Sequence, residues 1–355
     1  MNSKTRSAGY DIIRILSIFS VVMIHTLVPY LGNTEIKSAG YVPAMLICSL
    51  CLIGAPLFFM LSGAFLLDTS SSVGIGKPFF KRITKQLVPF LIWSVIYVIA
   101  RIAMGKLALS AEAFTSLLYR PAYDQFWFMY VLLLLYLLLP LLQAMLLRLN
   151  KRGVEILLLI CWLLTTVIPL ISWLAGGHLK ARPFVDIISF FLYTGYFILG
   201  YYLKKYRSDT PSSVAVALIC VGAVLTLVSA LAEWLAVADF HGILFRDYST
   251  PALPLLTGGV FILLGKIKSV KSERAMSVIS HLGVLTVGVF YIHMLVLKGI
   301  SLVIGDGSDS LLFAIIICIL VTVLSYLLSF VISLIPVAKT LLLGIGTEKR
   351  EVSRQ

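Results

Sequence analysis

The sequence predicts an all-α protein, a polytopic membrane bundle of about ten transmembrane helices with both termini in the cytoplasm. Hydrophobic residues make up 60% of the 355 residues, charged residues only 13%, and mean hydropathy is +1.01. These values exclude an ordinary soluble globular protein. Apolar runs of about 20 residues, the length of helix that crosses a bilayer, recur along the chain. Basic residues gather in alternate connections between these runs, as in multi-span membrane proteins.

The apolar runs define ten candidate spans, each long enough to cross the hydrocarbon core. They cover residues 12–30, 44–67, 84–104, 126–147, 154–174, 184–203, 212–236, 250–268, 283–302 and 311–335. No long linker, low-complexity tract or internal repeat interrupts the series. We therefore expect residues 1–355 to form one integral-membrane domain, without an appended extracytoplasmic domain.

The basic residues orient the chain. If the N-terminus is cytoplasmic, the inner connections and tails hold about 21 of the 29 Lys and Arg residues, and every inner loop is richer in them than its outer neighbours. This places both termini inside. The net charge of +13 does not predict nucleic-acid binding, because the basic residues lie in short loops and not on one continuous face.

The N-terminus and the cysteines could be mistaken for other signals. Lys4 and Arg6 precede an apolar run, as in a signal peptide, but residues 12–30 are long enough to span and lack a small-x-small cleavage site. We expect a retained helix. The five cysteines lie in apolar stretches, and Cys48-x-x-Cys51 has no second ligand pair, so we expect buried cysteines, no metal and no structural disulfide.

The first span carries ionisable side chains where apolar ones are expected. Arg14 and His25 are eleven positions apart, so on a helix they differ by about 20° in direction and lie about 16 Å apart, while Asp11 shares their face three residues before Arg14. An Arg at mid-span costs about 2.5–3.5 kcal/mol, so this face should meet protein or a water-filled cavity. His25 can take a proton from an attacking hydroxyl. The alternative is a hydrogen-bonded histidine between packed helices.

A basic cluster opens the third span on its predicted cytoplasmic side. Lys81, Arg82 and Lys85 fall within one and a half helical turns, a geometry suited to the phosphates of a cytosolic anionic ligand. A basic flank contacting acidic lipid head groups explains the same charges. Charge alone leaves both interpretations open.

Small and helix-disturbing residues interrupt the second span. Pro56, Ser62 and Gly63 would permit close helix approach or an opened backbone that binds a ligand. Ser62 is a weak candidate nucleophile, because no G-x-S-x-G turn surrounds it. Packing is the expected role of this stretch.

Aromatic residues and a second histidine mark two further spans. Trp127 and Tyr130 begin the fourth span on its outer side, where an interfacial aromatic belt explains them and a platform for sugar rings is the alternative. Tyr291 and His293 lie inside the ninth span. A structural role and a role in substrate or proton handling remain equally open for this pair.

Together these stretches resemble the integral-membrane acyltransferase-3 family, and within it the short O-acetyltransferases of bacterial surface polysaccharides, including the enterobacterial common antigen type. The resemblance covers nearly the whole chain. It is carried by Asp11-x-x-Arg14 with Arg14-x10-His25, by the runs VVMIHT, PLFFMLSG and WFMYVLLLLYL, and by Tyr291-x-His293.

The resemblance implies acetyl-CoA as co-substrate, no permanently bound cofactor, and a sugar hydroxyl as acceptor. It implies that His25 and Arg14 are the essential pair, which Asp11 would support by orienting Arg14. The family's cytoplasmic Arg-x-x-Arg motif handles the coenzyme; here Arg82 is followed three residues later by Lys85, which keeps the charge but loses the bidentate fork. Larger relatives carry an extracytoplasmic SGNH-type domain, and none is expected here.

A mechanism follows from the residues and the resemblance together. Acetyl-CoA would bind from the cytoplasm with its phosphates near Lys81, Arg82 and Lys85, and its pantetheine arm would enter the bundle past Arg14. His25 would act as general base on the acceptor hydroxyl or accept the acetyl group itself. Arg14 would stabilise the oxyanion or position the coenzyme.

The resemblance further implies a multi-pass protein of the bacterial inner membrane. A glycan or lipid-linked saccharide would be the acceptor, and partner proteins of glycan biosynthesis fit this setting. Ser62, Trp127, Tyr130, Tyr291 and His293 are the candidate acceptor-binding residues.

Rival functions remain. A transporter or flippase also buries Arg and His in its spans. A succinyl or other acyltransferase, or a membrane recognition module without turnover, would keep the same fold.

Overall fold

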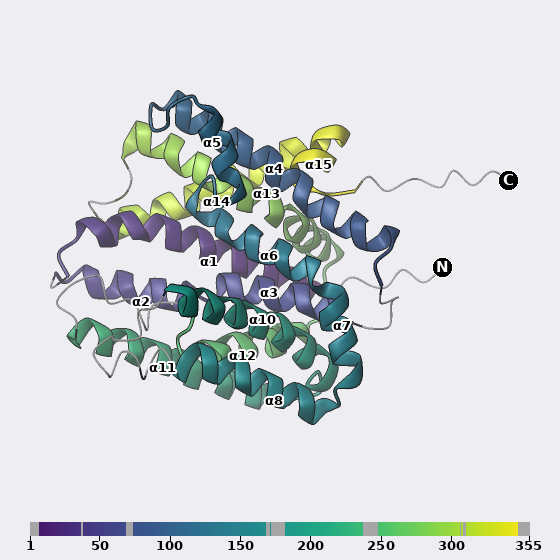
Figure 1. Ribbon diagram of the computed structural model, residues 1–355. Helices are drawn as coiled ribbons and strands as arrows, with labels where there is room; N and C mark the ends of the chain where they lie inside the picture. The colour runs from purple at the N-terminus through teal and green to yellow at the C-terminus, as the bar shows by residue number, and fades with distance from the viewer. Residues whose placement is uncertain are drawn as a thin grey trace.

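In the computed structural model all regular secondary structure of the described residues is helical, and the long helices run side by side (Figure 1). The description covers residues 7–36, 38–68, 74–167, 171, 182–236, 248–305, 307 and 310–346, with side chains left out at 182–189, 233 and 236. Six helices within this part are long and apolar enough to cross a membrane, or seven if one bent pair counts as a single span. This confirms the prediction of an all-α, multi-span protein.

Most of the ten predicted spans coincide with helices. The six long spans are α1 (Ala8–Asn33), α2 with α3 (Tyr41–Cys51 and Gly54–Leu66), α4 (Lys77–Ala103), α11 (Ser212–Ala236), α13 (Glu273–Ile304) and α14 (Leu311–Leu334). The bent pair is α6 (Trp127–Leu137) and α7 (Leu139–Arg148), preceded by the short helices α5 (Ala111–Thr115), η1 (Ser116–Leu118) and η2 (Asp124–Phe126).

Three predicted spans, 154–174, 184–203 and 250–268, stay predictions as complete crossings. They fall on α8 (Lys151–Trp162) with the π-helical turn η3 (Leu163–Val167), on α10 (Arg182–Tyr206) and on the shorter apolar helix α12 (Leu253–Gly265). Residues 168–170 and 172–174 of the first lie outside the described residues. The predicted cytoplasmic position of the termini also stays a prediction; the start of α1 and the last helix, α15 (Pro336–Leu343), lie at the same end of the bundle (Figure 1).

Prolines explain two breaks inside predicted spans. A proline within a helix lacks the amide hydrogen and clashes with the carbonyl four residues earlier. Pro56 follows the break between α2 and α3, and Pro140 follows the break between α6 and α7, where the axis bends by 56°. Residues 126–147 therefore do not form one straight helix.

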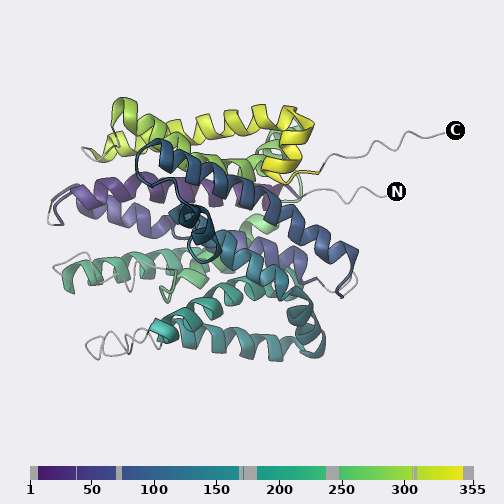
Figure 2. The ribbon, with the colours of Figure 1, turned by 45° about the horizontal axis from the view of Figure 1, so that its top comes forward.

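Helix α1 lies in the middle of the bundle. In Figure 2, α13 and α14 lie on one side of it and α8, α10, α11 and α12 lie on the other. It contacts α2, α3, α12, α13 and α14. Its fully buried residues include Ile13, Ile18, Val22 and Leu27. Of its ionisable residues, Asp11 is fully buried and Arg14 and His25 are half-buried, so protein covers the polar face of the first span only in part.

Helices α3 and α10 approach each other through glycines. A Cβ on Gly63 would lie 1.7 Å from the Phe197 carbonyl oxygen, and one on Gly200 would lie 1.9 Å from that of Met60. No side chain fits either gap, so the two backbones are in direct contact. This confirms close helix approach at Gly63, one of the three residues from which it was predicted.

The five cysteines are all free. Cys161 and Cys318 are buried and Cys48 and Cys51 are half-buried, as the apolar context predicts. Cys220 is exposed. The prediction of burial is wrong there because Cys220 lies on the outward face of α11, which a bilayer would cover.

Candidate functional site

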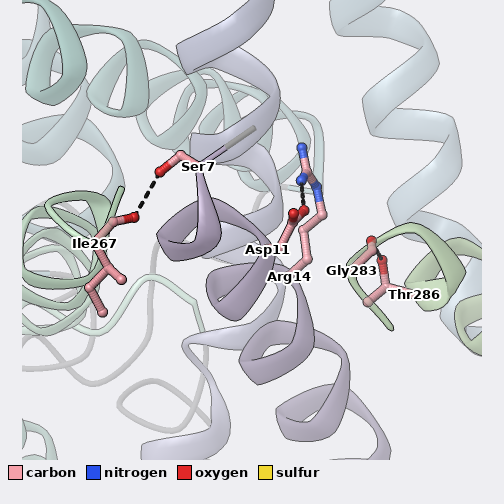
Figure 3. A network of polar contacts seen from close by, with 6 residues as sticks. All are labelled: Ser7, Asp11, Arg14, Ile267, Gly283 and Thr286. Atoms are coloured by element: carbon pink, nitrogen blue, oxygen red, sulfur yellow. Dashed lines mark hydrogen bonds and ion pairs between the residues drawn. The ribbon is translucent and has the colours of Figure 1, made fainter. Parts of the chain in front are cut away.

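Asp11 and Arg14 form an ion pair at the start of α1. The Arg14 Nη1 atom lies 2.5 Å from Asp11 Oδ1, and Figure 3 shows both side chains leaving the same side of the helix. Asp11 is fully buried, while the Arg14 side chain is 31% exposed. A buried carboxylate is stable only when it is paired, so Asp11 fixes the direction of Arg14. This contact is the one that the i, i+3 spacing predicts.

A glycine on α13 makes room for Asp11. A Cβ placed on Gly283 would lie 2.7 Å from both the Cβ and the Oδ1 atoms of Asp11. Any larger residue there would push into the carboxylate that holds Arg14. The arrangement therefore depends on close packing between α1 and α13.

The first turn of α1 is attached to the segment that follows α12. Ser7 Oγ donates a hydrogen bond to the Ile267 carbonyl at 2.9 Å (Figure 3), and the Gly9 amide donates to the same oxygen at 2.8 Å. The Ala8 amide donates to the Lys268 carbonyl at 3.2 Å. The first amide groups of a helix have no partner inside it, and here backbone carbonyls supply those partners. The position of Asp11 and Arg14 is thereby fixed.

His25 lies against His293, which comes from the predicted ninth span. The two ring centroids are 5.4 Å apart, with the ring planes tilted by 39°. His293 is fully buried and its Nδ1 lies 2.9 Å from the Val289 carbonyl oxygen. Since a carbonyl only accepts, Nδ1 carries the proton and Nε2 of the neutral ring is an acceptor. Nε2 has no hydrogen-bond partner among the described residues.

Arg14 and His25 stand well apart along one helix. Helix α1 runs without interruption through both residues, so the eleven-residue spacing separates them by about 16 Å along the axis. An oxyanion-stabilising donor must lie about 3 Å from the oxygen it serves. At this distance Arg14 cannot contact an acyl carbonyl that reacts beside His25. The other role expected for Arg14, positioning the coenzyme, stays a prediction.

The basic cluster on α4 divides between a cavity and the surface. Arg82 lines a cavity of about 170 Å³ beneath the bend between α6 and α7, together with Phe79, Pro140 and Gln143. Lys81 and Lys85 are exposed. Of the three residues of the predicted coenzyme site, Arg82 alone lines this partly open cavity.

The two candidate acceptor-binding tyrosines make packing contacts. The Tyr130 hydroxyl lies within hydrogen-bond distance of the backbone carbonyls of Leu117 and Arg120, and its one hydrogen is shared between them or donated to either. Tyr291 is buried, stacks on Trp93 with centroids 5.8 Å apart, and lies with its hydroxyl 3.7 Å from Met129 Sδ. Residues two apart on a helix do not face each other, so Tyr291 does not share the direction of His293.

The other two acceptor candidates lie nearer the bundle surface. Trp127 is half-buried and its ring contacts those of Tyr193 and Tyr248, with centroids 5.0 and 5.5 Å away. Ser62 is half-buried on α3. Among the described residues no group of three or more His, Cys, Asp or Glu side chains could hold a metal ion.

Sequence reasoning missed several residues around this site. Three features depend on contacts between helices: the pairing of His25 with His293, the space left by Gly283, and the Phe65 ring beside Arg14. The Arg14 Cζ atom lies 5.9 Å from the centroid of that ring. Only the histidines gave a signal, as ionisable residues inside separate spans.

The comparisons place the chain in a family. A family model described as an acyltransferase domain matches residues 7–330, a range that includes both histidines, the Asp11–Arg14 pair and the α4 cluster. No curated protein and no solved structure matches the chain. The chain therefore belongs to the acyltransferase 3 family and is a multi-pass membrane acyltransferase.

Proposed function

We propose that the protein is an O-acetyltransferase of the bacterial inner membrane that moves an acetyl group from cytoplasmic acetyl-CoA to a hydroxyl of a cell-surface or lipid-linked glycan. Family membership supports acyl transfer in general. The choice of donor and acceptor rests on the resemblance of the motifs to surface-polysaccharide O-acetyltransferases. The observation that carries the proposal is the contact between the fully buried His293 and His25, which is half-buried on the helix that also holds Arg14.

The two histidines supply the proton chemistry. As the acceptor oxygen attacks the thioester carbonyl carbon, His25 takes the hydroxyl proton. The C–S bond then breaks, and the departing thiolate receives that proton from His25, which restores the neutral ring. The Nε2 atom of His293, which has no partner among the described residues, would accept a hydrogen bond from the acceptor hydroxyl or from the His25 ring during the reaction. The contact with the Val289 carbonyl holds His293 in the tautomer that this requires.

The donor would enter from the end of α1 that carries Arg14. Its phosphates would stay near the basic residues at that end, and the uncharged pantetheine arm would run beside α1 toward His25. Asp11 keeps the Arg14 guanidinium directed to one side. Arg14 thus positions the coenzyme, and the acyl carbon reacts about 16 Å further along the helix.

Purified protein with radiolabelled acetyl-CoA and candidate lipid-linked or polymeric glycans tests this function. Label that moves only to a glycan indicates direct transfer. Label that stays on the protein without acceptor indicates an acyl-enzyme. Unlabelled succinyl-CoA added as a competitor tests the alternative donor. Absence of coenzyme binding would contradict the proposal and favour a transporter or a recognition module.

A further inference from the structure

A second cationic group faces the same aromatic ring as Arg14. The Arg14 Cζ atom lies 5.9 Å from the Phe65 ring centroid, and the Lys204 Nζ atom lies 4.4 Å from it. Cations within about 6 Å of an aromatic face are attracted to it. The ring of Phe65 is 45% exposed. Two cations from α1 and α10 therefore meet at one accessible ring on α3.

Packing of α3 on α10 explains why Lys204 reaches this ring. Gly200 precedes Lys204 by one helical turn, and its backbone touches α3 at Met60. The Lys204 ammonium donates a hydrogen bond to the Ala64 carbonyl at 3.0 Å. That carbonyl belongs to the last turn of α3, where carbonyls lack helical partners and attract cations. The backbone contact between the helices thus sets the position of the ammonium.

An anionic side chain already lies beside Lys204. Asp68 Oδ2 is 4.0 Å from Lys204 Nζ, and the two side chains are 52% and 30% exposed. Ion pairs this exposed contribute little, because water screens them. A phosphate group with more charge and more acceptor oxygens would displace such a carboxylate.

The basic cluster of α4 lies near this arrangement without a cation–π contact to Phe65 among those of the described residues: Gln143, which lines the Arg82 cavity, donates a hydrogen bond to the Leu66 carbonyl at 2.7 Å. Helix α4 packs mainly on α5, α6 and α15, whereas Phe65 and Lys204 belong to α3 and α10, which pack on each other. The cations at Phe65 also include Arg14, whose helix leads to His25. A phosphate held at Phe65 therefore lies at the start of the helix that carries the reactive histidine.

We propose that Arg14 and Lys204, held against Phe65, form a phosphate-binding site for the coenzyme. The Asp68 carboxylate pairs with the Lys204 ammonium when no phosphate is bound. The site takes a phosphate or diphosphate group. The inference rests on the proposed function in one respect, that the donor is a coenzyme A thioester. It assigns donor binding to Lys204 in addition to the α4 cluster.

Binding of coenzyme A to the purified full-length protein, measured by isothermal titration, tests the site. Lys204→Met should weaken binding about tenfold, because a hydrogen bond to a charged group is lost, and Lys204→Arg should retain most of the affinity. Asp68→Asn should strengthen binding about twofold, because it removes the competing anion. In the Lys204→Met background, Asp68→Asn should have no effect.

Lys205 provides the matched control. It is the next residue of α10, but its ammonium donates to the Tyr201 hydroxyl at 2.6 Å and faces the Tyr201 and Tyr206 rings. Lys205→Met should leave coenzyme affinity unchanged. In acetyl transfer, Lys204→Met should raise KM for acetyl-CoA and leave kcat at saturating donor unchanged, because the histidines are intact.

The outcomes separate this inference from the proposed function. Wild-type protein that binds no coenzyme contradicts the function itself. Wild-type and Lys204→Met proteins that bind coenzyme equally overturn only the phosphate site. Loss of copurified anionic phospholipid in Lys204→Met, with unchanged coenzyme affinity, would identify a lipid phosphate as the occupant and would also overturn it. The effect of Asp68→Asn provides a second test if Lys204→Met fails to fold.

Discussion

Helix α1 carries ionisable side chains at two places, Asp11 with Arg14 near its start and His25 toward its other end. These two ends differ in how the side chains are paired. At the start of the helix, the buried Asp11 carboxylate is paired with Arg14, and Gly283 leaves it space. Further along, His25 meets an imidazole whose Nε2 has no hydrogen-bond partner among the described residues. An unsatisfied buried polar atom costs about 1–3 kcal/mol, and such costs persist where function requires them. Under the proposed function, the first end is the contact that binds the donor and the second is the place of proton transfer.

Replacing His25 should have the largest effect. His25→Ala removes the proposed general base, a group that contributes typically 10²–10⁴-fold to rate, so acetyl transfer should fall to background while the protein remains in the membrane. Transfer of radiolabel to glycan in membranes of equal protein content measures this. His281→Ala, at an exposed histidine of α13, is the matched control and should be active. An active His25→Ala variant would overturn the assignment of the reactive end.

Replacing His293 should lower the rate by less, on the order of tenfold, because His25 remains. His293→Asn keeps an amide donor near Nδ1 for the Val289 carbonyl but removes the Nε2 acceptor. His293→Gln places a polar group nearer the Nε2 position. The measured quantity is kcat at saturating acetyl-CoA. If both variants have the wild-type kcat, then His293 packs against His25 without a part in proton transfer.

At the start of α1, where Asp11 pairs with Arg14, a substitution should act through packing. Gly283→Ala places a Cβ where only 2.7 Å separates it from Asp11, and overpacking of this kind typically costs about 1–3 kcal/mol. The thermal unfolding temperature should fall, and KM for acetyl-CoA should rise as Arg14 loses its fixed partner. Gly299→Ala, on the same helix with nothing within 4 Å of the new Cβ, should not destabilise the protein. Equal behaviour of the two variants would show that the Asp11 contact does not position the donor.

The contrast between the two ends also explains what could be predicted from sequence. Asp11 and Arg14 interact within one helical turn, so their spacing alone predicts the pair. The contact between His25 and His293 joins helices far apart in the chain, and nothing in the periodicity of either span gives their relative rotation. The same limit applies to Lys204 at Phe65, since the meeting of α3 and α10 depends on Gly63 and Gly200.

Helix breaks show the same division between local and long-range information. Pro56 is a visible interruption in the second span, and the structure breaks beside it. The bend at Pro140 has an equally local cause, but the cavity that it forms with Arg82 depends on how α4 packs against the bent pair. For the α4 cluster, the sequence therefore predicts the three charged residues, but it does not predict which of them lines the cavity.

The smallest expected effect comes from Ser62, the one hydroxyl considered as a rival to the histidines. Ser62 lies inside α3 beside the Gly63 contact with α10, and the sharp strand-to-helix turn that exposes a nucleophilic serine is absent from α3. Ser62→Ala should change kcat by less than about twofold and should leave unchanged any label that acetyl-CoA transfers to the protein, since a base acting directly on the acceptor needs no serine. Loss of retained label in Ser62→Ala, with label still retained in Ser49→Ala as a control for a buried helical serine, would move the acyl-accepting group from α1 to α3. The reactive end of α1 would then only activate a serine on the neighbouring helix.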